Sequence, residues 1–209
     1  MAKIVLRPNE DISVSGFSQY PDEGDFYAKV NEDGDGDGDD TYVSRDSLAG
    51  SIRFGIPSSS VGGSINEIVV YIRIRSTDAT IKGAGRPLVR IDDSSTWVSD
   101  TKHEPGISYE LYSWTLTENP VTENPWTWSD IDALQIGATL YEGKYNSGGE
   151  IIYPVRMTQV WLEIDYTNKP TAILEATSGI TNNAATVNGK ISDDGGEACD
   201  VRFRWRKKV

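Results

Sequence analysis

Nine residues of the sequence, Glu32 to Asp40, read EDGDGDGDD and carry six carboxylates separated only by glycine. Within this acidic stretch, Asp33, Asp35 and Asp37 occupy alternate positions and Gly38 follows them. The spacing matches the first half of a calcium loop, in which alternate carboxylates converge on one ion and a glycine permits the sharp turn. Calcium is therefore the chemistry that this stretch favours first.

The second half of the acidic stretch fits that pattern less well. An EF-hand loop counted from Asp33 would place its bidentate glutamate where this chain has Ser44. Asp39, Asp40 or a carboxylate from another loop would have to complete the ligand set. Two interpretations follow. The stretch is a solvated acidic loop that also discourages edge-to-edge association, or it is a calcium site formed by Asp33, Asp35, Asp37, Asp39 and Asp40.

The sequence offers little for catalysis. His103 is the single histidine, so nothing beyond this one residue supports a histidine-based catalytic triad. A zinc site with several histidines is excluded within one chain. The pairs Asp92 with Asp93 and Glu163 with Asp165 are of the type that glycoside hydrolysis uses, but nothing places a cleft beside them. We expect no enzyme and no catalytic residues, and a surface or turn position for His103.

Two tryptophans offer a different chemistry. Trp126 and Trp128 flank Thr127 and are either a platform on which a sugar ring stacks, as in a carbohydrate-binding module, or residues that pack in the core and its turns.

Composition and charge limit the class of protein. The formal net charge of -12 and the pI near 4.5 argue against a nucleic-acid partner, because phosphate binding requires a basic face. The single cysteine, Cys199, excludes an intrachain disulfide. No apolar run is long enough for a membrane span, and the start MAKIVLRPNE lacks the regions of a signal peptide. We expect synthesis in a cytoplasm and no membrane partner.

Alternating apolar residues predict strands. The pattern is clearest over 68–74, 52–56, 134–140 and 160–166, and less regular over 3–7, 26–30, 41–44, 87–91 and 109–116. In the last range the apolar positions change from odd-numbered to even-numbered residues between Leu111 and Tyr112, which predicts a bulge. One short helix is expected near residues 129–133, with Ser129 and Asp132 forming a capping box. Roughly nine strands with turns between them predict an all-β, antiparallel two-sheet sandwich.

A second pattern follows the linker Tyr166–Pro170. Val201, Phe203 and Trp205 alternate with arginines in a segment, 171–209, that is too short to support its own core without a disulfide or metal. We therefore predict that contacts beyond its own strands order this segment. Its basic end is either a solvated strand face or a docking strand for partner binding, formed by Arg202, Phe203, Arg204, Trp205 and Arg206.

Residues 1–168 resemble a family of β-sandwich proteins encoded by tailed phages and prophages. The resemblance is carried by IVLRPN at the start, DDTYV (39–43), NPWTWSDIDALQIGATL (124–140) and VRMTQVWLEIDY (155–166). It implies a jelly-roll-like fold and a non-enzymatic virion part. The Asp-Gly alternation of the acidic stretch is longer than the family pattern.

Residues 169–209 are similar to the first strands of bacterial and phage fibronectin type III-like domains, and a complete domain of that type needs roughly 90 to 100 residues. The leading hypothesis is a virion structural protein displayed on a capsid or tail, in a decoration, fibre or receptor-binding role. Its partners would be other virion proteins or copies of itself. The alternative is a carbohydrate-binding or adhesin module with a host-surface glycan as partner.

Overall fold

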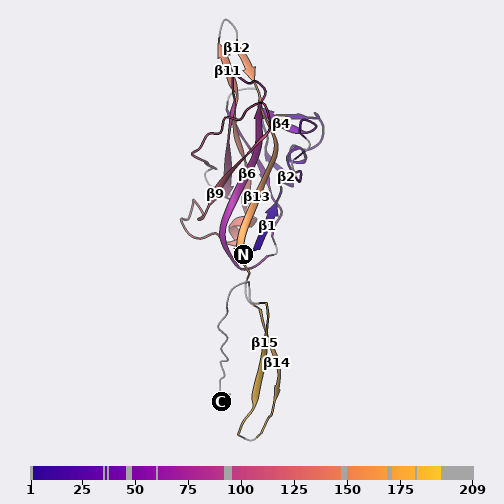
Figure 1. The fold of residues 1–209 in the computed structure, drawn as a ribbon, viewed down its shortest axis with the longest axis vertical. Coiled ribbons are helices and arrows are strands. Elements are labelled where there is room, and N and C mark those ends of the chain that lie inside the picture. The colour runs from indigo at the N-terminus through magenta and orange to yellow at the C-terminus, as the bar shows by residue number, and fades with distance from the viewer. Residues whose placement is uncertain are drawn as a thin grey trace.

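The computed structural model describes residues 2–34, 36, 38–45, 49–59, 61–91, 96–146, 150–168, 171–181 and 183–193. Strands dominate these residues and most of them form two sheets that face each other (Figure 1). The helical elements within the described ranges are one short α-helix and one 3-10 turn.

Each large sheet is antiparallel throughout. The six-stranded sheet has the order β3 (Ser18–Tyr20), β4 (Tyr42–Arg45), β13 (Val155–Thr167), β6 (Ser64–Ser76) and β9 (Glu110–Leu116), and β1 (Ala2–Leu6) pairs with β13 on the edge that β4 also uses. The five-stranded sheet has the order β2 (Glu10–Ser13), β5 (Gly50–Gly55), β10 (Leu134–Tyr141), β7 (Ala84–Ile91) and β8 (Thr96–Val98).

The order of the strands identifies the fold. If the eight strands β4 to β10 and β13 are numbered along the chain, the sheets read 1-8-3-6 and 2-7-4-5. The chain therefore passes repeatedly from one sheet to the other, as in a jelly roll of eight strands. The predicted all-β, jelly-roll-like sandwich is confirmed by this connectivity.

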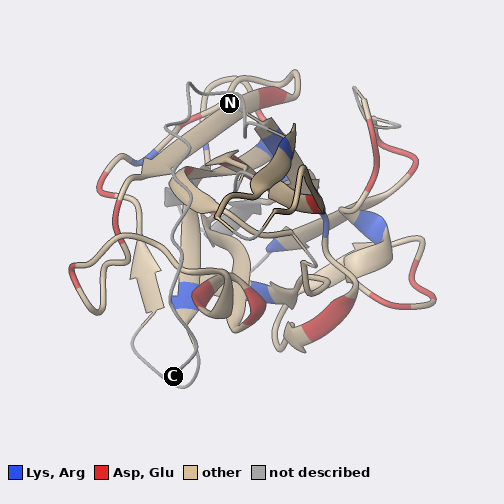
Figure 2. Ribbon diagram, turned by 90° about the horizontal axis from the view of Figure 1, so that it is seen from below, with Lys and Arg blue, Asp and Glu red and all other residues tan. Residues whose placement is uncertain are grey.

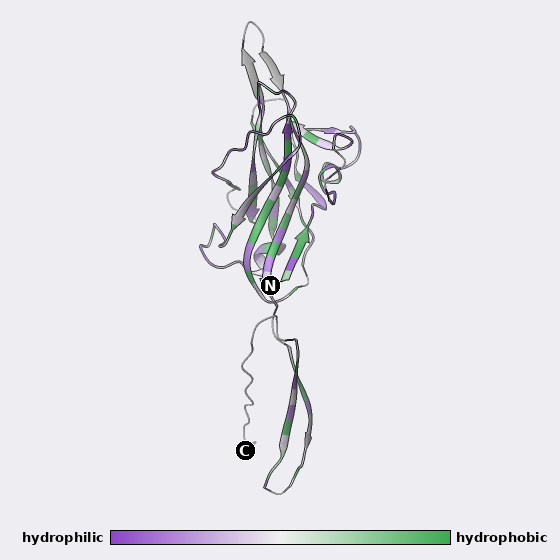
Figure 3. Ribbon diagram, in the orientation of Figure 1, coloured by the Kyte–Doolittle hydropathy of each residue, from purple (hydrophilic) through white to green (hydrophobic). Residues whose placement is uncertain are grey.

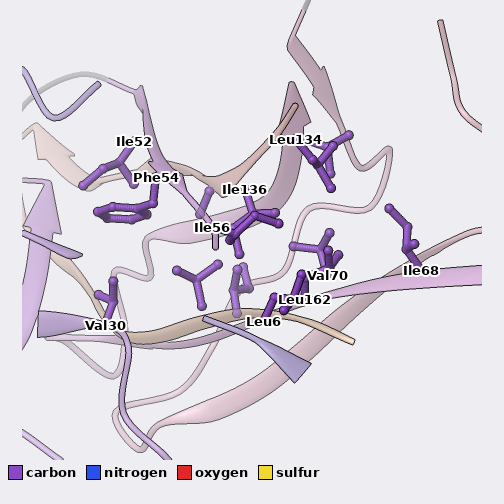
Figure 4. Close-up of a cluster of buried hydrophobic side chains, with 14 of the residues drawn as sticks. Leu6, Val30, Ile52, Phe54, Ile56, Ile68, Val70, Leu134, Ile136 and Leu162 are labelled. Atoms are coloured by element: carbon purple, nitrogen blue, oxygen red, sulfur yellow. The ribbon is translucent and has the colours of Figure 1, made fainter. Parts of the chain in front are cut away.

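The core lies between the two sheets and follows the alternation of the sequence. Side chains at alternate positions of β5, β6, β10 and β13 meet there, among them Phe54, Val70, Ile136 and Leu162, which are fully buried (Figure 4). Burial of each such side chain contributes roughly 1.5 to 3 kcal/mol relative to exposure. Apolar residues accordingly follow the strands of the sandwich (Figure 3), and this face-to-face packing fixes which side chains point outward.

Two local predictions about strands were wrong. Residues 26–30 hold the 3-10 turn η1 (Tyr27–Lys29) instead of a strand, because the Asp11 carboxylate accepts the N–H groups of Phe26 and Tyr27 at 2.8 and 2.7 Å and fixes a turn there. β9 pairs with β6 without a register shift, so the expected bulge is absent, and Leu111 is an exposed apolar residue on the outer face.

The predicted helix exists, but its cap lies two residues earlier than expected. In α1 (Trp128–Asp132) the capping box is formed by Thr127 and Asp130. The Thr127 hydroxyl accepts the Asp130 N–H at 3.2 Å, and the Asp130 carboxylate accepts the Thr127 N–H at 2.8 Å.

Two hairpins extend from opposite ends of the sandwich (Figure 1). One consists of β11 (Gly143–Asn146) and β12 (Glu150–Tyr153), and the other of β14 (Thr171–Ser178) and β15 (Thr186–Asp193). Every residue of β14 is exposed, and Leu174 reaches 74% exposure. In the described part of the chain no helix has the length and apolar character to span a membrane.

Candidate functional site on the six-stranded sheet

The described residues of the acidic stretch lie against the outer face of the six-stranded sheet. Asn31 forms a bridge with Gln159 of β13, beside a bulge between Met157 and Gln159. The Gln159 side chain is fully buried, and its Nε2 donates to the carbonyls of Glu32 and Gly34 at 3.1 and 3.2 Å. The Gln159 side chain and the bridge at Asn31, and not only charge, therefore position Glu32 and Gly34.

Asp39 is held by three side chains from separate parts of the chain. Its carboxylate accepts two hydrogen bonds from Arg75, with Nε at 3.2 Å and Nη2 at 2.5 Å, and one each from Arg156 Nη1 and Tyr109 Oη, both at 3.0 Å. Burial alone would raise the pKa of the Asp39 carboxyl, but the bonds from Arg156, Tyr109 and Arg75 together lower it. Burial, followed by the neighbouring Asp39 carboxylate, raises the pKa of Tyr109.

Asp33 makes a looser contact of the same kind. Its carboxylate lies 2.7 Å from Arg7 Nε, while its side chain remains 92% exposed. Arg7 also donates to the Glu32 carbonyl and lies over the Trp161 ring, 5.4 Å from its centroid. Arg7 therefore joins the acidic stretch to the aromatic side chains of the sheet.

These contacts bear on the predicted calcium ligands. Asp33 and Asp39 face arginines, and Asp40 is exposed. Asp35 and Asp37 lie outside the described residues. Within the described ranges no group of three or more His, Cys, Asp or Glu side chains is arranged to hold a metal ion. Calcium binding stays a prediction, and it now depends mainly on residues other than Asp39.

Two aromatic stacks flank this charged cluster on the outer face. Tyr71 of β6 and Trp161 of β13 are direct partners across the strands, with ring centroids 4.8 Å apart and planes at 9°. Tyr20 and Tyr42 stack at 5.4 Å on β3 and β4, and the Arg156 guanidinium lies 4.2 Å from the Tyr42 centroid. Burial, and then the charge of Glu163, raises the pKa of Tyr71.

The two tryptophans considered from sequence are not part of this face. Trp126 is 4% exposed and donates its indole N–H to the Leu116 carbonyl at 3.1 Å. Trp128 donates to the Gly63 carbonyl at 2.9 Å and meets Tyr166 edge to face at 5.3 Å. The structure supports the core-and-turn interpretation, because both indole N–H groups donate to backbone carbonyls within the fold.

The remaining candidates have structural partners or lie outside the description. His103 bridges to Gly85 and stacks on Tyr112 at 4.2 Å, and burial lowers its pKa. Glu163 pairs with Lys3 at 2.5 Å, and Asp165 accepts from Asn66 at 2.7 Å. Of these remaining candidates, the following lie outside the described ranges: Asp92, Asp93, Arg202, Phe203, Arg204, Trp205 and Arg206.

Comparisons with known proteins give no family. No family model and no curated protein matches the chain. Among solved structures, it is similar to a xylan-binding module CBM15, with 9% identity, coverage of 80% of this chain and 99% of that chain, and a TM-score of 0.41.

Two further solved structures show a similar degree of likeness. A CBM4 structure has 12% identity, coverage of 72% and 95%, and a TM-score of 0.37. The C-terminal CBM6 of LamC, a laminarinase from Zobellia galactanivorans, has 13% identity, coverage of 76% and 100%, and a TM-score of 0.37. All three scores lie below 0.5, so we base neither the fold nor a function on these likenesses.

Proposed function

We propose that this chain is a non-catalytic glycan-binding domain whose ligand lies on the outer face of the six-stranded sheet. The observation that carries the proposal is the outward pair of Tyr71 and Trp161, stacked at 4.8 Å in a row of polar side chains. Sugars present an apolar C–H face to aromatic rings and a rim of hydroxyls to charged and polar groups. The row offers both kinds of contact.

The position of each ring identifies the one available for a sugar. β1 and β6 pair with opposite edges of β13, so Trp161 lies between Arg7 on one side and Tyr71 on the other. Tyr71 ends the stack, and its neighbour in the row is Ser113 of β9. A sugar ring stacked on Tyr71 would meet the hydroxyl of Ser113 and the guanidinium of Arg73 in the adjacent row.

The test is a glycan array followed by affinity measurements with the strongest ligand. Tyr71→Ala should weaken binding at least about tenfold, which corresponds to about 1.4 kcal/mol, and Tyr71→Phe should retain most of it. Trp97→Ala is the matched control, because Trp97 is 41% exposed on the edge strand of the other sheet. Equal losses in Tyr71→Ala and Trp97→Ala, or an array without any ligand, would refute the proposal.

A second candidate function is assembly on a virus particle, with the chain displayed on a capsid or tail. The resemblance of residues 1–168 to phage sandwich proteins motivates it, and the exposed β14–β15 hairpin favours it, because an isolated two-stranded hairpin is at best marginally stable in water. Immunogold labelling of purified particles tests this role. A truncation ending at Asn168 should fold but be missing from particles, and its normal incorporation would contradict the role of the hairpin.

A further inference from the structure

The segment between β8 and β9, residues 99–109, is hydrogen-bonded to both sheets, and we refer to it as the strap. On the five-stranded sheet, the backbones of His103 and Gly85 exchange two hydrogen bonds of 3.0 and 2.9 Å. On the six-stranded sheet, the Ser76 N–H donates to the Gly106 carbonyl at 2.8 Å. The strap therefore ties β7 to β6 at one edge of the sandwich.

The strap also reaches the cluster around Asp39. Arg75 Nη1 donates to the Ile107 carbonyl at 3.1 Å, while Nε and Nη2 of the same guanidinium hold the Asp39 carboxylate. Tyr109, the last residue of the strap, donates its hydroxyl to Asp39 at 3.0 Å. A change in the strap is therefore transmitted to the acidic stretch through two side chains.

The imidazole of His103 lies in the middle of the strap and is stacked on Tyr112 of β9, with ring centroids 4.2 Å apart and planes at 21°. Its Nε2 atom is buried and has no hydrogen-bond partner among the described residues. A neutral imidazole can leave Nε2 without a hydrogen, whereas a protonated one carries an N–H on both nitrogens. Protonation would therefore bury a donor without an acceptor, which is costly.

The charged surroundings of His103 do not compensate for this burial. Burial lowers the pKa of His103 below its ordinary value of 6.5, and no charged group of the described residues contributes to that shift. On β9, Glu110 accepts the Tyr112 hydroxyl at 2.7 Å and the Gly106 N–H at 2.6 Å. The titratable and charged groups of the strap and of the chain beside it are Lys82, Arg86, Asp100, Lys102, Glu104, Tyr109, Glu110, Tyr112, Tyr141 and Glu142.

The charge of the whole molecule acts in the opposite direction. The chain has a formal net charge of -12, and acidic residues are spread round the periphery of the sandwich, many of them in loops (Figure 2). The face of the Tyr112 ring also attracts a cation. Salt screens the remote surface charges, but it does not supply an acceptor to the buried Nε2 atom. Local burial therefore decides which form of the imidazole fits the closed strap.

We propose that the strap is a pH-sensitive latch, which is closed while His103 is neutral and opens when the imidazole gains a proton in mildly acidic solution. The stabilisation by the closed strap is complete above the unfolded-state pKa of His103 and is lost as pH falls through the lower folded-state pKa. Opening separates His103 from Gly85 and withdraws the Ile107 carbonyl from Arg75. The latch does not depend on glycan binding at Tyr71, so either proposal can fail alone.

The first test is the titration of the His103 imidazole by proton NMR in the untagged chain, which has one histidine and therefore one imidazole signal to follow. The same chain unfolded in urea supplies the reference midpoint. We expect the folded chain to titrate at a lower pH than this reference. A folded midpoint equal to the reference or above it would overturn the inference without the need for any variant.

The second test is amide hydrogen exchange at pH 7.5 and pH 5.0, with each rate divided by that of an unstructured peptide at the same pH. The reporters are the amides of His103, Gly85 and Ser76, because each is hydrogen-bonded in the closed strap. We expect their protection to fall at least about fivefold at pH 5.0, while that of β10 changes less than about twofold. Equal protection of the reporters at both pH values would contradict the latch.

His103→Phe keeps an aromatic ring against Tyr112 but cannot gain a proton, so protection of the remaining reporters, Gly85 and Ser76, should be the same at both pH values. Glu104→Gln is the matched control, because it removes a titrating carboxyl from the same segment and should keep the pH dependence of the wild type. Thermal melts confirm that each variant folds. The inference is overturned if His103→Phe retains the pH dependence or if Glu104→Gln abolishes it.

Discussion

The two outer faces of the sandwich use arginine in different ways. On the six-stranded sheet, Arg75 and Arg156 share the carboxylate of Asp39, and Arg7 meets Asp33. On the five-stranded sheet, Arg53 and Arg86 contact a neutral amide and a backbone carbonyl. The difference teaches that arginines on one sheet are held by carboxylates of a concentrated acidic run, while Arg53 and Arg86 on the other sheet are held by uncharged acceptors.

Among the predictions that test this comparison, calcium binding has the largest expected effect on the free energy of unfolding. If Asp33, Asp35 and Asp37 bind calcium, the fold is stabilised by about 2.7 kcal/mol when free calcium is 100 times its dissociation constant. Thermal melts with calcium and with chelator measure the shift. Asp39→Asn should keep this shift, because arginines already hold Asp39. Identical melts, together with no heat of binding, would leave arginine pairing as the role of the acidic stretch.

Loss of the Asp39 carboxylate comes next. Asp39→Asn should lower the free energy of unfolding by about 1 to 2 kcal/mol, because charge-assisted bonds are lost and two arginines remain close together, although solvent screens this half-exposed site. Urea unfolding measures the change. Asp40→Asn is the control and should stay within about 0.5 kcal/mol. Equal effects at the two positions would mean that only the net charge matters.

Acid should remove the same contribution. The folded-state pKa of Asp39 lies below its ordinary value of 3.8. The stabilisation is therefore complete above the unfolded-state pKa and is lost as pH falls through the lower folded-state pKa. The difference in unfolding free energy between the wild type and Asp39→Asn should be constant from pH 7 to about 5 and shrink below about pH 4. A difference that grows on acidification would contradict the assigned contacts.

The smallest expected effect compares one arginine from each sheet. Arg75→Gln removes a bidentate partner of Asp39 and should cost about 1 kcal/mol of stability. Arg53→Gln removes a charge that Arg90 repels, so its stability should stay within about 0.5 kcal/mol of the wild type. Chemical denaturation of both variants measures these two changes in the free energy of unfolding. A larger loss in Arg53→Gln would show that the contact of Arg53 with Gln135 stabilises the fold.

The fold was largely predictable because burial follows a simple period. The alternation over 68–74 and 160–166 identified the two longest strands and their buried faces. Residues 26–30 have a similar composition, but the distant Asp11 carboxylate fixes a turn there. A side-chain contact across 15 residues leaves no periodic signal in the sequence.

The candidate site was only half predictable. The sequence marked the acidic stretch and the alternation over 68–74, but it did not reveal that Asp39 meets Arg75 and Arg156. These partners are 36 and 117 residues away from Asp39. Their meeting depends on which strand lies beside which, and on how the chain passes over Gln159. Neither follows from local composition.

The place of β13 in the six-stranded sheet has a consequence for synthesis of the chain. This strand pairs with β1, β4 and β6, yet its residues, 155–167, are the last of the sandwich to leave the ribosome. Pairing between such distant residues gives a high contact order, which slows folding to roughly milliseconds to seconds. The open edges of β4 and β6 are exposed to other chains until β13 arrives, and the nascent protein is most prone to aggregation in that interval.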